Sequence, residues 1–384
     1  MNDNNRSDAY ISADELARIS KQIIKLNQHP SGSYVACPLF SNYAFSWLRD
    51  GSFIAYAMDV CGETESAGAF YEWVNGVLAR QQDRVRHLLE KKARGEWIDQ
   101  SEYLHTRYHL DGRDDDHSEW GHFQLDGYGA WLWGVTEHWK AIGQETLPES
   151  YRASVELTVR YLCAFWQLPN FDCWEERNDQ IHPSTLACIY GGLEAIRSYI
   201  DFPELAAIPE QIKQLLLTHA VHPQGNYFVK SIRPLPEPDR YEISYDGVDA
   251  SLLWLCQPFR ILPAEHPVME ATLAQIGQKL KTPAGGIRRY AADEYYGGGE
   301  WILLTAWQGW VDAQSGKQTE AQQALRWIVQ QADARGRLPE QVPHTDIDRG
   351  TFDQWTGTVG HAGSSAAVVA CDVSCAILPA ARIG

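Results

Sequence analysis

The sequence predicts an all-α protein in which six helical hairpins form a double-layered barrel. The first observation behind this prediction is that apolar residues recur at helical spacing in twelve segments. The second is that the connections between these segments alternate between short and long, as expected for helical hairpins arranged in a ring. The long loops should then gather at one end of the barrel and form a pocket there.

The predicted helices extend over most of the chain. In order they cover residues 13–28, 51–60, 63–95, 125–142, 149–166, 183–200, 203–220, 247–256, 267–281, 299–313, 319–334 and 358–378. Residues 226–232 and 240–245 are strand-like, which predicts a small β-hairpin within a loop. Because no linker rich in glycine or serine divides the chain, we expect one domain over residues 1–384, with residues 1–12 as a flexible tail.

Composition excludes several classes of partner. The chain is 44% hydrophobic and carries a net charge of -17, which is typical of a well-packed protein whose acidic surface repels phosphate groups. We therefore expect no nucleic-acid partner and no membrane partner, and the apolar stretch 366–378 is too short to cross a bilayer. The polar amino terminus lacks the apolar segment of a secretory signal, so the expected location is the cytoplasm.

Cysteine and aromatic content narrow the expectations further. Eight cysteines without paired spacing predict buried thiols rather than disulfides, with Cys371 and Cys375 on one apolar helix face. The acidic loop from Asp111 to His117 lacks the alternating ligands of an EF-hand, so we interpret it as a solvated loop and expect neither a metal nor a cofactor. Fifteen tryptophans and eighteen tyrosines favour a carbohydrate ligand, because rigid aromatic faces stack on sugar rings.

The third long loop contains two adjacent carboxylates, Glu175 and Glu176, between Trp174 and Arg177. An apolar neighbour raises the pKa of a carboxyl group and a guanidinium lowers it, so the pair could hold one acid and one carboxylate. Two carboxyl groups with separated pKa values suit glycosidic chemistry. The alternative is that both glutamates only occupy the start of the helix that opens at Pro183, where the helix dipole favours them.

The first two long loops contain candidate sugar contacts. Arg49 and Asp50 supply a donor fork and an acceptor pair, which could hold vicinal hydroxyls or could form a salt bridge at a helix cap. Trp120 is a candidate stacking wall, and Asp126 could cap the helix that follows.

The last two long loops complete the set. Arg289, Tyr290 and Trp301 surround a glycine run and could form a sugar-binding wall, whereas the alternative is a flexible loop with a surface arginine. Glu340 follows a proline and is the natural partner for Glu175, although on its own it would be a surface glutamate.

Taken in order, these segments resemble those of glucoamylases and their relatives, glycoside hydrolase family 15. The matching segments are Tyr43 to Gly51, Trp120 to Asp126, Trp174 to Glu176, Arg289-Tyr290 with Trp301, and Leu338 to Gln341. The resemblance covers about residues 35–375 and implies an (α/α)6 barrel, in agreement with the alternation of loop lengths.

The resemblance implies a role for each matching residue. Glu175 would be the general acid and Glu340 the general base that activates water, with Tyr43 beside the base and the anomeric centre. Arg49 and Asp50 would grip the terminal glucose. Further substrate contacts would come from Trp120, Trp174, Glu176, Arg289 and Trp301.

The implied activity is that of an inverting, exo-acting α-glucoside hydrolase that releases β-glucose from short oligosaccharides. A barrel without an added domain resembles the compact isomaltose glucohydrolase branch of the family, so an α-1,6 disaccharide such as isomaltose is the expected substrate. Inversion requires room for a water molecule, and the two carboxyl groups should therefore lie ~6.5 to 9.5 Å apart.

Two other classes stay open. The same barrel carries inverting phosphorylases and trehalases, although a phosphorylase needs a basic phosphate site where Glu340 stands. The second class is a non-catalytic sugar-binding or regulatory module, and the presence of both Glu175 and Glu340 argues against it. The sequence carries no signal for an oligomeric state.

Overall fold

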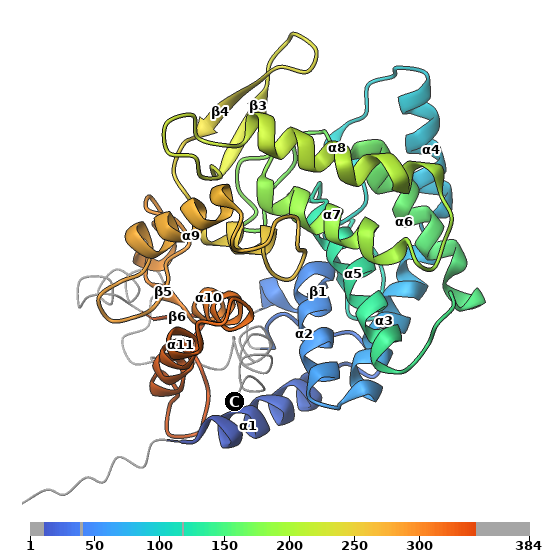
Figure 1. The fold of residues 1–384 in the computed structure, drawn as a ribbon. Helices are drawn as coiled ribbons and strands as arrows, with labels where there is room; N and C mark the ends of the chain where they lie inside the picture. The colour runs from blue at the N-terminus through green and yellow to red at the C-terminus, as the bar shows by residue number, and fades with distance from the viewer. Residues whose placement is uncertain (1–10, 39–40, 117–118, 343–384) are drawn as a thin grey trace, which may run out of the picture.

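The computed structural model describes residues 11–38, 41–116 and 119–342, and these residues are predominantly helical (Figure 1). A helix lies in each of the eleven predicted segments that fall within the described residues. The twelfth, residues 358–378, lies outside them, as do Cys371 and Cys375. The α-helices are α1 (Ala13–Asn27), α2 (Leu48–Val60), α3 (Thr64–Ala79), α4 (Gln82–Ala93), α5 (Asp126–Ala141), α6 (Arg152–Phe165), α7 (Pro183–Ile196), α8 (Pro203–His219), α9 (Pro267–Lys279), α10 (Ile302–Gln314) and α11 (Gln318–Gln330).

The described helices pack in two layers. The inner layer comprises α2, α5, α7, the 3₁₀ helix η4 (Ala250–Leu255) and α10, each packed on the next in this order. These elements are buried over most of their length, whereas α1, α8, α9 and α11 bury one face only and lie outside. Inner helices approach closely: a Cβ on Gly129 of α5 would lie 2.3 Å from the Cys188 carbonyl oxygen of α7. Glycine therefore permits the contact between α5 and α7.

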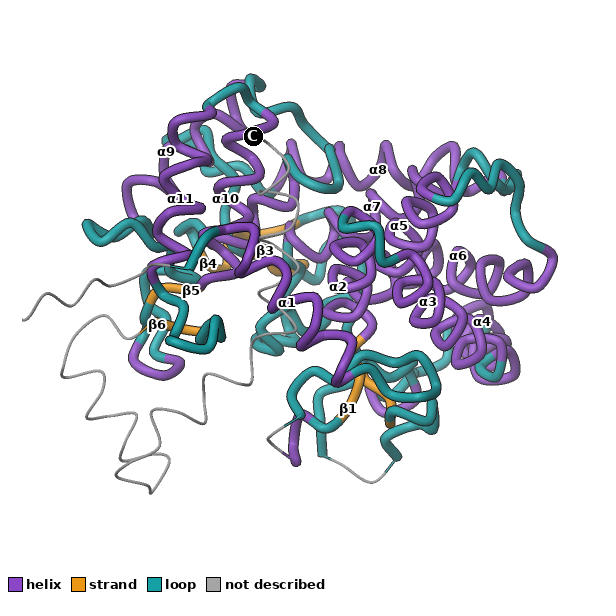
Figure 2. Tube along the Cα trace, turned by 90° about the horizontal axis from the view of Figure 1, so that it is seen from below, coloured by secondary structure: helices purple, strands orange, loops and turns teal. Residues whose placement is uncertain are grey.

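In the described part of the chain, three short antiparallel sheets join the loops. They pair β1 (Phe45–Trp47) with β2 (Arg107–His109), β3 (Ser231–Pro234) with β4 (Tyr241–Tyr245), and β5 (Glu300–Trp301) with β6 (Gln341–Val342). The predicted hairpin is confirmed as β3 and β4, although its first strand begins later than predicted, at Ser231. The other two sheets were not predicted, because each pairs residues from different loops. Figure 2 shows β1, β5 and β6 on the same side of the helices.

Most predicted helix ends lie within four residues of the observed ones, and three differences concern a start, a break and a helix type. Helix α2 begins at Leu48, so Arg49 and Asp50 lie in its first turn rather than in the loop before it. The single helix predicted for residues 63–95 is broken between α3 and α4, where the Gln81 amide donates to Asp114 at 2.8 Å. Residues 250–255 form a 3₁₀ helix instead of the predicted α-helix, and the Asp249 carboxylate caps it by accepting from the Ser251 backbone N–H at 2.8 Å.

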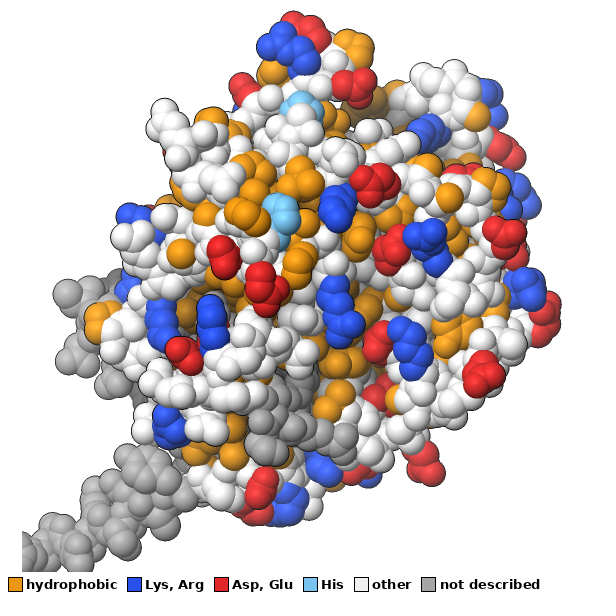
Figure 3. All heavy atoms as spheres, viewed as in Figure 1, with side chains coloured by type: hydrophobic (Ala, Val, Ile, Leu, Met, Phe, Trp, Pro, Cys, Tyr) orange, Lys and Arg blue, Asp and Glu red, His pale blue; other side chains and the backbone are white. Residues whose placement is uncertain are grey.

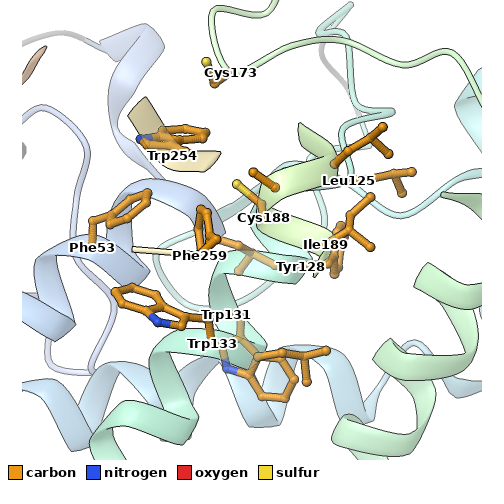
Figure 4. Close-up of a cluster of buried hydrophobic side chains, with 14 of the residues drawn as sticks. Phe53, Leu125, Tyr128, Trp131, Trp133, Cys173, Cys188, Ile189, Trp254 and Phe259 are labelled. Carbon is orange, nitrogen blue, oxygen red and sulfur yellow. The ribbon is translucent and has the colours of Figure 1, made fainter. Parts of the chain in front are cut away.

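Aromatic side chains fill the centre of the barrel (Figure 4). The ring centroid of Phe53 on α2 lies 5.6 Å from that of Trp254 on η4 and 5.1 Å from that of Trp307 on α10. Trp133 of α5 and Phe259 pack beneath them, at 5.8 and 6.3 Å from Phe53. These rings come from several inner elements, so they pack the described inner helices against one another.

The surface carries side chains of both charges. Figure 3 shows acidic and basic side chains interspersed over one face, without a large patch of one sign. Within the described ranges, no helix has the length and apolar character needed to cross a bilayer. Among the cysteines of this part of the chain, Cys37, Cys173, Cys188 and Cys256 are buried, as predicted, whereas Cys61 and Cys163 are only partly buried.

Candidate active site

A cavity of about 410 Å³ lies where the long loops meet the inner helices, and its size falls in the range of small-molecule sites. Nine of the ten predicted site residues line it: Tyr43, Arg49, Asp50, Trp120, Trp174, Glu175, Arg289, Trp301 and Glu340. The tenth, Glu176, lies outside the lining and contacts it from behind. The fold thus brings together residues from five loops.

Glu175 lies in a tight turn between α6 and α7, where its backbone has φ 64°. A non-glycine residue in this left-handed region costs about 1–3 kcal/mol, so its surroundings must hold it there. The Asp172 carboxylate does so, because its Oδ1 accepts from the backbone N–H groups of Trp174 and Glu176 at 3.0 and 2.8 Å. Helix α7 begins only at Pro183, so the two glutamates do not occupy its first turn and that alternative is wrong.

The Glu175 carboxylate is held through one oxygen. Its Oε1 accepts from the Trp47 indole N–H at 2.8 Å and from the Gln124 amide at 2.9 Å. The other oxygen, Oε2, has no hydrogen-bond partner among the residues that the structure describes. A protonated Glu175 would therefore carry its proton on Oε2, where a ligand in the cavity could take it.

Glu176 and Arg289 form a second pair beside the turn. Glu176 accepts from the Tyr290 hydroxyl at 2.7 Å and from Arg289 Nη2 at 3.5 Å. Arg289 is buried and also binds Asp293, through Nε at 2.8 Å and through Nη2. Because the guanidinium is buried and paired, the alternative of a flexible loop with a surface arginine is wrong.

Glu340 immediately precedes β6, which pairs with β5 so that Gln341 lies opposite Trp301. A Cβ on Gly299 would lie 2.3 Å from the Val342 carbonyl oxygen, so glycine permits this pairing. Burial raises the pKa of Glu340 to about 7, against the opposing effect of the nearby Arg289 guanidinium. Glu340 therefore changes charge near neutral pH.

Aromatic residues surround the two carboxyl groups. The Tyr43 hydroxyl lies 3.3 Å from the Tyr295 hydroxyl, and burial raises the pKa of Tyr43, so that its hydroxyl stays neutral at neutral pH. The Tyr43 ring packs against Trp47 and Trp120, with centroids 6.0 and 6.4 Å away. The Arg107 guanidinium covers Trp120 at 3.9 Å from the ring centroid. Trp301, from the second predicted sugar-binding wall, packs on Trp174 with ring centroids 5.7 Å apart.

The contacts of Arg49 and Asp50 fit both alternatives from the sequence, a salt bridge at the start of a helix and a binding site for sugar hydroxyls. Arg49 Nη1 donates to Asp126 at 3.0 Å and to Gln124 at 3.1 Å, while its Nη2 makes only a longer ion pair of 3.4 Å with Asp50 Oδ2. This Asp50 oxygen is buried and accepts no hydrogen bond from the part of the chain that is described. Asp50 therefore retains an acceptor for a ligand hydroxyl.

The acidic loop after β2 is solvated only in part: Asp111, Arg113 and Asp116 are exposed, as predicted, but Asp114 and Asp115 are not. Asp115 is buried and binds the Arg107 guanidinium at 2.8 Å, and Asp114 binds Arg84 at 3.0 Å. His105, Asp114 and Asp116 come close enough to share a cation. Arg84 also lies 3.3 Å from the His105 ring, so a positive charge already occupies this cluster.

Several residues that contact the site were not predicted as site residues. Trp47 and Gln124 donate to Glu175, Asp172 holds its turn, and Tyr295 contacts Tyr43. Each belongs to a segment that the sequence marked as part of the site, so their positions carried a signal. The partners of Trp47, Gln124 and Tyr295 come from other loops, however, and only the fold identifies these contacts.

Comparison with known proteins supports the family that the sequence predicts. A family model described as glycosyl hydrolases family 15 matches residues 11–364. The chain belongs to this family. As a member of family 15 it is a glycoside hydrolase that acts on a sugar substrate, and the predicted family is confirmed.

Two relatives match most of this chain. Isomaltose glucohydrolase of Kribbella flavida is 39% identical over 353 residues, which are 90% of this chain and 87% of that protein. The trehalase of Mycolicibacterium smegmatis is 25% identical over 374 residues, which are 88% of this chain and 53% of the trehalase.

Solved structures agree in fold. A wild-type glycosidase has a TM-score of 0.86 at 37% identity and a variant in complex with glucose has 0.85, with 97% of both chains covered in each case. A bacterial glucoamylase complexed with acarbose has a TM-score of 0.69 at 20% identity, over 96% of this chain and 55% of that one. The fold of this chain is thus the (α/α)6 barrel of family 15 glucoamylases, as predicted.

Proposed function

We propose that this family 15 member is an inverting, exo-acting α-glucosidase that releases β-glucose from short oligosaccharides. The observation that carries the proposal is that Glu175 and Glu340, which lie on loops far apart in the sequence, line one cavity. An acid and a base on either side of a glycosidic bond are what inversion requires, with the carboxyl groups ~6.5 to 9.5 Å apart.

The shape of the cavity supports action at a chain end. Phe53, Trp254 and Trp307 line the cavity and also pack on one another, with centroids 5.0 to 5.6 Å apart. They form a floor that a polysaccharide chain cannot pass. Such a site admits a terminal sugar, while the rest of the chain extends from the mouth. Arg49 and Asp50 adjoin this floor and would bind the terminal glucose.

The hydrogen bonds of Glu175 support its role as the general acid. With Oε1 held by Trp47 and Gln124, a proton on Oε2 could pass to the glycosidic oxygen. Glu340 would take a proton from water on the opposite face, and Tyr43 would stand beside the anomeric carbon. Glu176, Arg289, Trp174, Trp120 and Trp301 would contact the substrate or hold the residues that do.

The proposed substrate is an α-1,6 disaccharide such as isomaltose. Support comes from the 39% identity to an isomaltose glucohydrolase over nearly all of both chains. Trehalose is a second candidate, because a trehalase matches 88% of this chain at lower identity.

The decisive experiment follows glucose release by proton NMR from isomaltose, maltose, panose, trehalose and soluble starch. We expect isomaltose to give the highest kcat/KM and the new glucose to appear first as the β-anomer, because water attacks the face opposite the leaving group. Initial α-glucose would contradict inversion, and a preference for trehalose or for long α-1,4 chains would contradict the proposed linkage. Absence of glucose from every substrate would contradict the hydrolase mechanism as a whole.

The pH dependence should reflect Glu340. Burial raises its pKa to about 7, and a general base works only when it is ionised. We therefore expect kcat/KM for isomaltose to decline as the pH falls through about 7, because the protonated carboxyl group cannot accept a proton from water. Samples returned to neutral pH serve as the control for stability. An acid limb near the ordinary glutamate pKa of about 4.3 would contradict this expectation.

A further inference from the structure

Lys230 is a buried lysine immediately before β3, with 3% of its surface exposed. Its ammonium group donates to Asp172 Oδ2 at 3.1 Å and to Asp249 Oδ2 at 2.5 Å. It also lies 4.0 Å from the centroid of the Tyr290 ring. Lys230 does not line the cavity, so it does not act on a substrate directly. A buried charge of this kind has a high desolvation cost and needs its partners to offset it.

Each partner of Lys230 contacts a residue next to Glu175. Asp172 accepts from the backbone N–H groups of Trp174 and Glu176, as described above. Asp249 accepts from the indole N–H of Trp174 at 3.0 and 3.2 Å. The residues before and after Glu175 are thus both tied to the same ammonium group through its two carboxylate partners.

We propose that Lys230 is a positioning residue that fixes the left-handed turn carrying Glu175. By binding Asp172 and Asp249 together, it holds the backbone N–H groups of Trp174 and Glu176 and the Trp174 indole. The effect on catalysis rests on the proposed role of Glu175 as the general acid. The effect on the conformation of the turn does not depend on that role.

The physical reason lies in the charges. Without Lys230, Asp172 and Asp249 would be two buried carboxylates close to each other, and like charges repel strongly in a poorly screened interior. Although burial opposes it, the Lys230 ammonium keeps the pKa of Asp172 below its usual value, so that this carboxylate stays ionised. Loss of Lys230 would weaken the hydrogen bonds between Asp172 and the turn. The backbone of Glu175 would then leave its strained conformation at φ 64°.

The test uses the full-length chain with Lys230→Met, which keeps the apolar stem and removes the charge. We expect amide hydrogen exchange of residues 172–177 to become at least about 10-fold faster, while the core helices keep their protection. We expect kcat for isomaltose to fall about 100-fold, because a small displacement of a catalytic group has that effect. Hydrolysis of α-glucosyl fluoride should fall less than about 10-fold, because fluoride leaves without a proton from Glu175.

Two further variants distinguish a positioning role of Lys230 from a general loss of structure. Lys91→Met removes another paired lysine, whose ammonium donates to both Glu102 oxygens at 2.7 Å, and should change neither exchange of the turn nor the ratio of the two substrates. Lys230→Met combined with Asp249→Asn leaves one buried carboxylate instead of two. If the single variant does not fold, this double variant should fold and show the same loosened turn.

The outcomes are distinct. The proposal would be overturned if a folded Lys230→Met variant showed the wild-type exchange rate for residues 172–177 and the wild-type ratio of kcat for isomaltose to kcat for α-glucosyl fluoride. An equal loss on both substrates with faster exchange throughout the chain would also overturn it, since that is a structural role only. Faster exchange of the turn in a chain whose wild type hydrolyses no glucoside would uphold the positioning by Lys230 and contradict the proposed function alone.

Discussion

Replacing Glu340 with glutamine should lower kcat for isomaltose at neutral pH by about 10²- to 10⁴-fold, the range that a general base contributes. Glutamine has nearly the same shape but cannot accept a proton from water. Because Glu340 is drawn into the site by the pairing of β5 with β6, the fold and the affinity for glucose should change little. Steady-state kinetics and calorimetric glucose binding measure both effects.

A second variant makes the assignment of Glu340 sharper. Glu340→Ala leaves space on the face where the water would stand, and azide can enter it as a nucleophile that needs no base. Azide would form a bond to the anomeric carbon as the aglycone leaves with the proton from Glu175, giving β-glucosyl azide. Glu320→Gln, on the exposed side of α11, is the matched control. Near wild-type turnover by Glu340→Gln would remove Glu340 from the mechanism.

Replacing Glu175 with glutamine should lower kcat for isomaltose by a similar factor, about 10²- to 10⁴-fold, but should spare α-glucosyl fluoride. The glutamine can still accept from Trp47 and Gln124 through its amide oxygen, so the turn keeps its contacts. An alkoxide leaving group needs a proton, whereas fluoride does not. The ratio of the two kcat values therefore isolates proton donation from binding.

The same pair of substrates tests whether the roles are reversed. A carboxyl group with a pKa near 7, as burial gives Glu340, would suit an acid as well as a base near neutral pH. If Glu340→Gln retained hydrolysis of α-glucosyl fluoride and Glu175→Gln lost it, the acid would be Glu340. We expect the opposite result.

The sequence was informative about the barrel because helical periodicity and loop length are local properties. Short loops marked the antiparallel pairs, and long loops marked the end that carries the site. The type and the extent of individual helices were harder to predict from the sequence. The break between α3 and α4 depends on Gln81 reaching Asp114 in another loop, and the 3₁₀ form of residues 250–255 accompanies a cap from Asp249. Both interactions involve polar side chains, whereas the helix prediction rested on the spacing of apolar residues.

The sequence predicted residues that line the cavity, but it did not predict the buried residues that hold them in place. Trp174, Glu175 and Glu340 stood in recognisable segments, but Lys230 lay in a strand-like stretch with no local feature to mark it. Its carboxylate partner Asp172 is 58 residues away. A buried ion pair between distant loops leaves no pattern in either segment, so only the fold shows it.

The aromatic floor formed by Phe53, Trp254 and Trp307 has a consequence for product release under the proposed exo action. With the base of the cavity blocked by these rings, glucose would leave by the route through which the substrate entered. The shortened chain would stand in that route and would have to dissociate first. The enzyme would then act distributively: it would release a polymer after every cut, and a long chain would have to rebind for each glucose, whereas a disaccharide would not.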